Sequence, residues 1–147
     1  MTTVTHSFDH PLITVFDALA DPLTYPEWLL GAKEIRSIDP TWPSPGSSFR
    51  HRVGLIGPLT LADSSTVEHV KAPTLLVLEV RARPVGRARV TFRLRASGPA
   101  TTEVAFSEET IGYARALAPV AGPLAIPRNK RSLDNLEQFL DRDGVRR

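Results

Sequence analysis

Four polar side chains fall on strand faces that the alternation of the sequence otherwise assigns to apolar residues. They are His51, Asp63, His69 and Glu108. A polar group that faces a hydrophobic core needs a hydrogen-bond partner or water. Imidazole and carboxyl groups are also the commonest general acids and bases of enzymes. These four residues are therefore the candidates for acid–base chemistry.

His51 and Asp63 form a possible pair. If the strands that carry them join in a hairpin about Gly57, the two residues lie directly opposite each other. A carboxylate beside a histidine stabilises the imidazolium and orients the ring, as a general base requires. The alternative is that both side chains lie at the wet mouth of a cavity and only satisfy each other. A β-bulge would shift the phase of either strand, so both interpretations stay open.

The first 31 residues predict one strand and two short helices. Alternation from Thr2 to Phe8 indicates the strand. Asp9 can then cap a helix that has Pro11 in its first turn and ends before Asp21. A second short helix is expected from about Pro22 to Leu30, because its aromatic and leucine side chains share one side.

Alternation returns after Lys33 and predicts six further strands. Turn-forming residues separate these strands at positions 40–47, 57–58, 71–73, 84–86 and 98–99. Because the connections are short, neighbouring strands should pair antiparallel. One face of the resulting sheet is expected to be apolar and the other to face solvent.

A long helix is predicted near the end of the chain, from Pro127 to Asp141. Its apolar side chains recur at helical spacing and need a partner, which must be the sheet. These side chains are Leu133, Leu136, Phe139 and Leu140. The preceding stretch, Gly112 to Ile126, favours helix, but prolines recur every four residues, so a kinked or interrupted lead-in is expected.

The amino-acid composition limits the classes to which this protein can belong. A chain of 147 residues, 41% hydrophobic and 23% charged, fits one folded domain covering residues 1–147. The lack of cysteine excludes disulfides and thiolate chemistry. We find no secretion signal and no membrane span, so a cytoplasmic location is expected. Common nucleotide and zinc-protease motifs are also missing from the sequence.

Several segments in a fixed order resemble the polyketide cyclase/dehydrase-like branch of the START and Bet v 1 superfamily, also called SRPBCC. They are VFDALADPLTYPEW (15–28), PGSSF (45–49), APTLLVLEV (72–80), TEVAF (102–106) and RSLDNLEQFL (131–140). The resemblance implies an α+β helix-grip fold, in which a seven-stranded antiparallel sheet wraps around the last helix. It also implies a cavity for apolar or amphipathic small molecules, without a cofactor.

Three functions are compatible with that fold. The first is a carrier that binds a hydrophobic small molecule of lipid or polyketide type. The second is a polyketide cyclase, aromatase or dehydratase, with His51 or His69 as base and Glu108 as acid. The third is a chaperone-activator-like interaction module, which needs an exposed apolar patch. A homodimer stays open.

The expected pocket combines inner-face strand residues with aromatic residues of the short helices. Tyr25 and Trp28 either cover a ligand or fill the core, and Phe92 and Phe106 either line the pocket or pack. The full set is Tyr25, Trp28, Phe49, His51, Val67, His69, Leu78, Val90, Phe92, Phe106 and Glu108.

Two other patterns suggest binding less strongly. Arginines alternate onto the outer face of two adjacent strands, at Arg81, Arg83, Arg87, Arg89, Arg93 and Arg95. They could contact phosphates, but a hairpin about Pro99 instead pairs Arg95 with Glu103 and Arg89 with Glu109, so no nucleic-acid partner is expected. His6 and His10 belong to a strand and its end, so they do not share a face as helical ligands would, and no metal is expected.

Overall fold

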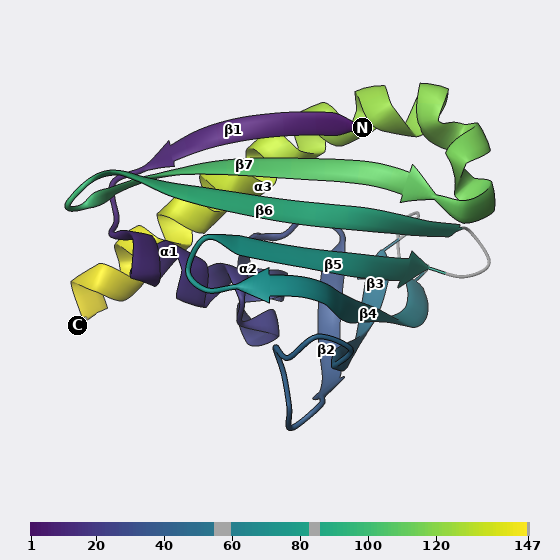
Figure 1. Ribbon diagram of the computed structural model, residues 1–147, viewed down its shortest axis with the longest axis horizontal. Helices are drawn as coiled ribbons and strands as arrows, with labels where there is room; N and C mark the ends of the chain where they lie inside the picture. The colour runs from purple at the N-terminus through teal and green to yellow at the C-terminus, as the bar shows by residue number, and fades with distance from the viewer. Residues whose placement is uncertain (55–59, 83–85, 147) are drawn as a thin grey trace.

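A computed structural model describes residues 1–54, 60–82 and 86–146 of the chain (Figure 1). The elements in order are β1 (Thr2–Phe8), α1 (Leu12–Leu19), η1 (Pro22–Thr24), α2 (Tyr25–Trp28), β2 (Ala32–Ile38), β3 (Ser48–Gly54), β4 (Thr60–Lys71), β5 (Leu75–Ala82), β6 (Gly86–Gly98), β7 (Thr101–Ile111), η2 (Gly112–Leu117) and α3 (Ala118–Arg146). Here η denotes a 3-10 helix. The predicted first strand has the observed bounds of β1.

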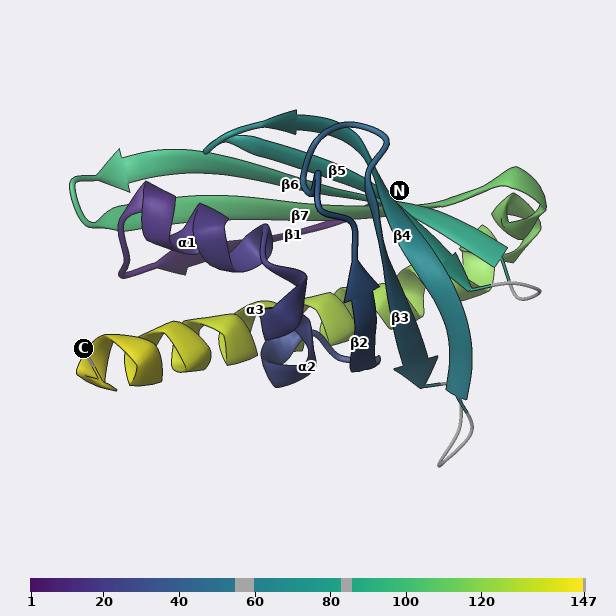
Figure 2. The same cartoon turned by 90° about the horizontal axis from the view of Figure 1, so that it is seen from below.

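The seven strands form one antiparallel sheet in the order β1-β7-β6-β5-β4-β3-β2. The sheet curves, and α3 runs beneath it with α1 and α2 on the same side (Figure 2). This arrangement is the helix-grip fold, so the predicted fold class is confirmed. The predicted hairpin apex at Gly57 and most of the turn at Pro84–Gly86 lie outside the described residues.

The apolar face of α3 is buried against the sheet, as its spacing predicts. Leu133, Leu136 and Leu140 are buried, and Phe139 is partly buried against the same core. They meet inner-face strand residues that alternate with half-buried ones, as on β7, where Val104 and Phe106 are buried. The helix therefore closes the open side of the curved sheet.

The start of the last helix was predicted too late. α3 begins at Ala118 and contains Pro123 and Pro127 in its interior. A proline removes the hydrogen bond to the carbonyl four residues earlier. Pro123 and Pro127 leave the carbonyls of Pro119 and Pro123 without a partner, and because these three residues are four apart and exposed, both carbonyls lie on one solvent-facing side. Water can satisfy them there, so the helix continues through the prolines.

Two details near the N-terminus also differ from expectation. Asp9 does not cap α1, because Pro11 occupies the N-cap position and the Asp9 backbone N–H donates to Glu137 Oε2 on α3 (3.0 Å). The predicted second helix is divided into η1 and α2, and it ends at Trp28 because Leu29 is extended. Asp21 caps η1 by accepting a hydrogen bond from the Leu23 N–H (3.0 Å).

Candidate functional site

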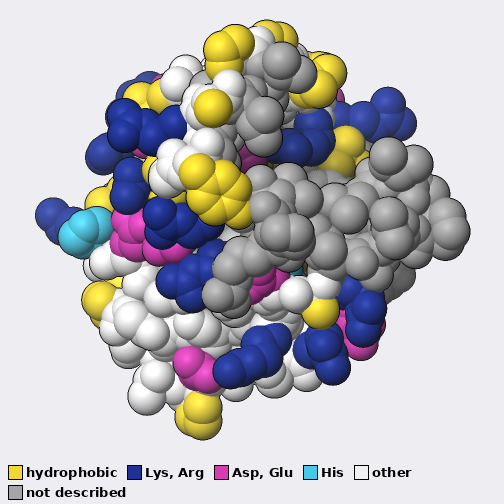
Figure 3. Space-filling view, turned by 90° about the vertical axis from the view of Figure 1, so that its right-hand side faces the viewer, with side chains coloured by type: hydrophobic (Ala, Val, Ile, Leu, Met, Phe, Trp, Pro, Cys, Tyr) yellow, Lys and Arg dark blue, Asp and Glu magenta, His cyan; other side chains and the backbone are white. Residues whose placement is uncertain are grey.

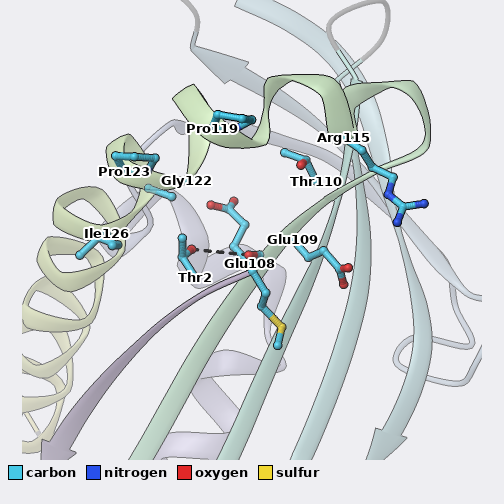
Figure 4. Close-up of a pocket in the computed structure, with 11 residues that line it drawn as sticks. Thr2, Glu108, Glu109, Thr110, Arg115, Pro119, Gly122, Pro123 and Ile126 are labelled. Atoms are coloured by element: carbon cyan, nitrogen blue, oxygen red, sulfur yellow. Dashed lines mark hydrogen bonds between the residues drawn. The ribbon is translucent and has the colours of Figure 1, made fainter.

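A recess of about 580 Å³ lies where β7 leaves the sheet and the chain turns back into α3. Its walls come from the start of β1, the end of β7, η2 and the first turns of α3 (Figure 4). The lining residues are Met1, Thr2, Glu108, Glu109, Thr110, Arg115, Pro119, Gly122, Pro123, Ala125 and Ile126. Proline, alanine, isoleucine and methionine side chains thus surround a few polar groups, which is the usual character of a small-molecule site.

The η2 helix and the first turns of α3 form an arch over this recess, and two glycines allow the backbone to follow this path. Gly112, at the end of β7, has φ of +63°, a conformation that side chains with a Cβ rarely adopt. It turns the chain from the strand into η2. Further along, a Cβ on Gly122 would lie 3.3 Å from Thr2 Cγ2, so the lack of a side chain lets α3 pass close over β1. Gly112 thus allows the turn at the end of β7, and Gly122 allows α3 to lie close to β1.

Glu108 is the acidic group inside the recess. Figure 4 shows its side chain pointing under the arch, toward Gly122, whereas Arg115 points away. The Glu108 side chain is 19% exposed and forms an ion pair with Arg128 of α3. Asn129, buried on α3, also donates to this carboxylate (3.4 Å). Glu108 therefore joins β7 to α3 at the recess, and its role as a catalytic acid stays a prediction.

His51 is buried on the inner face of the curved sheet. It pairs with Asp63 in the strand register, as predicted from a turn about Gly57. The residue is 4% exposed, and its Nε2 is 3.0 Å from the Ser65 hydroxyl. Ser65 is a partner that the sequence analysis did not identify, although it pairs with Phe49, two pairs further along the same hairpin and therefore on the same face. The two strands therefore hold a histidine, a carboxylate and a hydroxyl on one face.

Burial lowers the pKa of His51, while the nearby Ser64 backbone and the charge of Asp63 act in the opposite direction. The ring is therefore neutral at neutral pH. Its Nδ1 is buried and has no hydrogen-bond partner among the described residues. A neutral, desolvated imidazole with a free ring nitrogen can accept a proton or a hydrogen bond. A catalytic role for His51 and Asp63 stays a prediction.

His69 does not face the interior, so its predicted placement on the inner face is wrong. The β4–β5 register shifts between Val67, which pairs with Leu78, and His69, which pairs with Val77. This β-bulge reverses the alternation and leaves His69 exposed. His69 thus lies away from His51 and Glu108.

The aromatic residues of the predicted pocket contact one another in the core. Trp28 packs edge-on against Tyr25 and Phe92, with ring centroids 5.5 and 6.4 Å apart. The Trp28 indole N–H donates to Thr24 Oγ1 (3.0 Å), and the Tyr25 hydroxyl donates to the Leu19 carbonyl (2.5 Å). Burial, with a contribution from the charge of Asp21, raises the pKa of Tyr25. The polar edges of both rings are therefore satisfied within the protein.

The remaining apolar members of the predicted pocket are buried in the same cluster, and only Glu108 of the predicted set lines the described recess. These apolar members are Phe49, Val67, Leu78, Val90, Phe92 and Phe106. Their role toward a ligand stays a prediction. The recess residues of α3 and β1 were missed, although the prolines repeated every four residues marked the segment that forms the arch.

Two arginines of the stripe on the outer face form the cross-strand ion pairs that the hairpin about Pro99 predicts, and Arg83 lies outside the described residues. Arg95 Nη2 is 3.1 Å from Glu103 Oε2, and Arg89 Nη1 is 3.6 Å from Glu109 Oε2. Arg89 Nε is also 2.8 Å from Glu68 Oε2 of β4. The symmetry of the β6–β7 hairpin does not predict this partner, because β4 is not part of that hairpin. On the face drawn in Figure 3, acidic side chains lie among the basic ones. The predicted cross-strand pairing is therefore confirmed.

Within the described part of the chain, no helix is both long enough and apolar enough to cross a bilayer.

No family model and no curated protein matches this sequence. Solved structures do match. The Zhui aromatase/cyclase from Streptomyces sp. R1128 has a TM-score of 0.73 and 15% identity, over 96% of this chain and 93% of that chain. The di-domain ARO/CYC StfQ from the steffimycin biosynthetic pathway has a TM-score of 0.74 and 16% identity, over 99% of this chain and 47% of StfQ.

A third structure, the protein of unknown function SA2116 from Staphylococcus aureus, has a TM-score of 0.70 and 9% identity, over 98% of this chain and 96% of that chain. Identities this low establish the fold alone. The chain therefore shares its fold with these two aromatase/cyclases, and this is the helix-grip fold that the resemblance of its segments implies.

Proposed function

We propose that this protein binds a small hydrophobic or amphipathic molecule, of lipid or polyketide type, and acts as its carrier. The observation that carries the proposal is the recess of about 580 Å³ under the η2–α3 arch. Its volume falls within the range of about 300–1,000 Å³ that is typical of small-molecule sites. The fold supports the same proposal, because it places one apolar sheet face against one helix.

The lining favours an amphipathic ligand over a purely apolar one. Pro119, Pro123 and Ile126 offer apolar contact, while Glu108 and Thr110 offer oxygen atoms on the opposite wall. A hydroxyl or enol group can donate to these oxygens. We therefore infer a ligand with an apolar body and a neutral hydrogen-bond donor.

The test fills the recess and measures binding. Thr110→Phe places a bulky side chain in the recess, and Thr5→Phe makes the same change at an exposed position on β1. Native mass spectrometry of the purified protein first reports any small molecule that it holds. Titration with a fluorescent fatty alcohol should then show at least tenfold weaker binding for Thr110→Phe and unchanged binding for Thr5→Phe. Equal affinity in both variants would contradict the proposal.

A second candidate function, a polyketide cyclase or dehydratase, is favoured by His51. Its buried, neutral imidazole with an unpartnered Nδ1 has the properties of a general base. In such a reaction the imidazole would take a proton from the carbon beside a carbonyl. The resulting enolate would attack a second carbonyl, and the proton would return to the new alkoxide. Asp63 would stabilise the imidazolium between the two steps.

His51→Gln separates the two functions. A carrier should bind the fluorescent ligand as before, because His51 does not line the recess. An enzyme should lose turnover of a poly-β-ketone thioester mimic, while His69→Gln, a change at an exposed histidine, keeps it. Turnover that is the same in wild type and His51→Gln would remove His51 from the catalytic hypothesis.

A further inference from the structure

Two histidines and three carboxylates meet toward the C-terminal end of α3, far along the helix from the recess. Asp134, Glu137 and Asp141 are three and four residues apart, so they share one face of the helix. His6 of β1 and His10 of the turn after β1 reach this face. Figures 1 and 2 show the end of β1 near this part of α3. The contacts join residues about 130 positions apart in the sequence.

The distances within this cluster are short. His10 Nε2 is 2.7 Å from Asp141 Oδ1, and His6 Nε2 is 2.8 Å from Glu137 Oε1. His6 Nδ1 is also 3.4 Å from Asp134 Oδ1. One ligand atom each from His10, Glu137 and Asp141 lies within 4.8 Å of the other two. One imidazole nitrogen and two carboxylate oxygens thus converge on a common point.

We propose that His10, Glu137 and Asp141 bind a divalent transition-metal ion of the Zn²⁺ type, independently of the function proposed for the recess. Zinc bonds of about 2.0–2.2 Å in tetrahedral geometry place ligand atoms about 3.4 Å apart. Ligand atoms that already lie within 4.8 Å need to move by only about 1 Å, while the hydrogen-bonded His10–Asp141 pair opens slightly. Water completes the coordination on the solvent side, where the Asp141 side chain is 61% exposed.

The charge balance of the cluster favours a cation. Three carboxylates share one helix face, and like charges at this spacing destabilise a helix. In the described part of the chain, the ion pairs of these three residues are formed with His6 and His10 and not with lysine or arginine. Imidazoles are charged only when protonated. A divalent ion would offset the repulsion and would attract the ring nitrogen of neutral His10 at the same time.

Surrounding hydrogen bonds hold two of the ligands in place. Glu137 accepts from His6 Nε2 and, through Oε2, from the Asp9 N–H (3.0 Å). The Thr102 hydroxyl donates to the His10 carbonyl (2.8 Å) and fixes the turn that carries His10. His6 thus acts as a positioning residue for Glu137, the role that second-layer hydrogen bonds have at metal sites. The expectation of no metal compared only the two histidines and could not include the carboxylates of α3.

The donor set also indicates which ion should bind. Imidazole nitrogen suits zinc, cobalt, nickel and copper, whereas magnesium and calcium prefer sites made of oxygen alone. The ion would join the turn after β1 to α3 and hold the helix against the edge of the sheet. Bound metal should therefore raise the melting temperature, because it binds the folded chain and not the separated ligands of the unfolded one.

The experiment is calorimetric titration of the chelator-treated, full-length protein with ZnCl₂, supported by the visible spectrum of added Co²⁺. We expect one ion per chain, no displacement by excess Mg²⁺, and a higher melting temperature. Asp141→Asn, which keeps a hydrogen-bond acceptor for His10, should weaken binding at least tenfold and abolish the thermal shift. His10→Gln should do the same, and His6→Gln should weaken binding by about 10–100-fold, as loss of an outer-layer partner does.

His69→Gln is the matched control, because this exposed histidine lies outside the cluster and its replacement should leave zinc binding unchanged. The proposal is overturned if wild type shows no zinc binding, if Asp141→Asn binds as tightly as wild type, or if His69→Gln removes the bound ion. In each of these cases the cluster is a histidine–carboxylate clamp only. Should His10→Gln fail to fold, the near-isosteric Asp141→Asn still decides the question.

Discussion

The buried histidine on β3 makes the stability of this protein sensitive to acid. The unfolded chain protonates a histidine near its ordinary pKa of about 6.5. Burial lowers the pKa of His51 in the folded protein. Between these two pKa values the unfolded state binds one more proton than the folded state, so the contribution of His51 to stability is complete above pH 6.5 and is lost as the pH falls. The slope is at most about 1.4 kcal/mol per pH unit.

The perturbation is His51→Gln, which keeps a polar side chain beside the Ser65 hydroxyl and removes the titration. Urea unfolding at pH 7.5, 6.5 and 5.5 gives the free energy of unfolding of each protein. Between pH 6.5 and 5.5, wild type should lose up to about 1 kcal/mol more than the variant, whatever their difference at pH 7.5, because the unfolded histidine is only half protonated at pH 6.5. Comparing slopes cancels the titration of the other histidines and the carboxylates. His69→Gln, at an exposed position, should retain the wild-type slope.

Two results would refute this reasoning. If wild type and His51→Gln lose stability in parallel between pH 6.5 and 5.5, the imidazole is not desolvated in the folded protein. If His69→Gln alone flattens the curve, the acid sensitivity comes from a different histidine.

Three further changes have expected outcomes that equilibrium unfolding can measure. Leu136→Ala leaves a cavity at a fully buried position on α3 and should lower the free energy of unfolding by about 2–5 kcal/mol. Leu124→Ala, at an exposed position of the same helix, should change it by less than about 0.5 kcal/mol. Similar losses in both variants would contradict the packing of α3. Gly112→Ala should cost about 1–2 kcal/mol because φ is +63°, and a neutral result would mean that η2 leaves the sheet differently. Arg89→Ala should cost only about 0.2–1 kcal/mol, because its ion pair with Glu68 is solvent-accessible, and the difference should shrink in 1 M NaCl; a large, salt-independent loss would point to packing instead.

Local patterns were sufficient for most of the fold. Alternation and turn residues located the strands, and β1 has the predicted bounds. The symmetry of a hairpin about its turn also gave correct long-range pairs, His51 with Asp63 and Arg95 with Glu103. These predictions succeed because a short turn leaves an antiparallel pair almost no freedom of register. The buried face of α3 was predicted for the equivalent reason, since helical geometry fixes which side chains share a side.

The errors lie where the backbone departs from a regular period. The bulge before His69 reverses the facing of one residue, and nothing in the alternation of β4 marks it. The early start of α3 is tolerated because Pro123 and Pro127, the prolines inside the helix, both lie on its exposed side. In both places the local pattern was compatible with two structures, and contacts elsewhere in the molecule selected one.

The sequence by itself determined the order of the elements, the antiparallel pairing of neighbouring strands and the apolar face of the last helix, because each depends on residues close together in the chain. Only the tertiary structure decided where the recess lies, since its walls come from β1, β7, η2 and α3. The same is true of the cluster that joins His10 to Asp141. Which distant side chains meet depends on how the helix crosses the curved sheet, and that crossing results from the packing of the whole core.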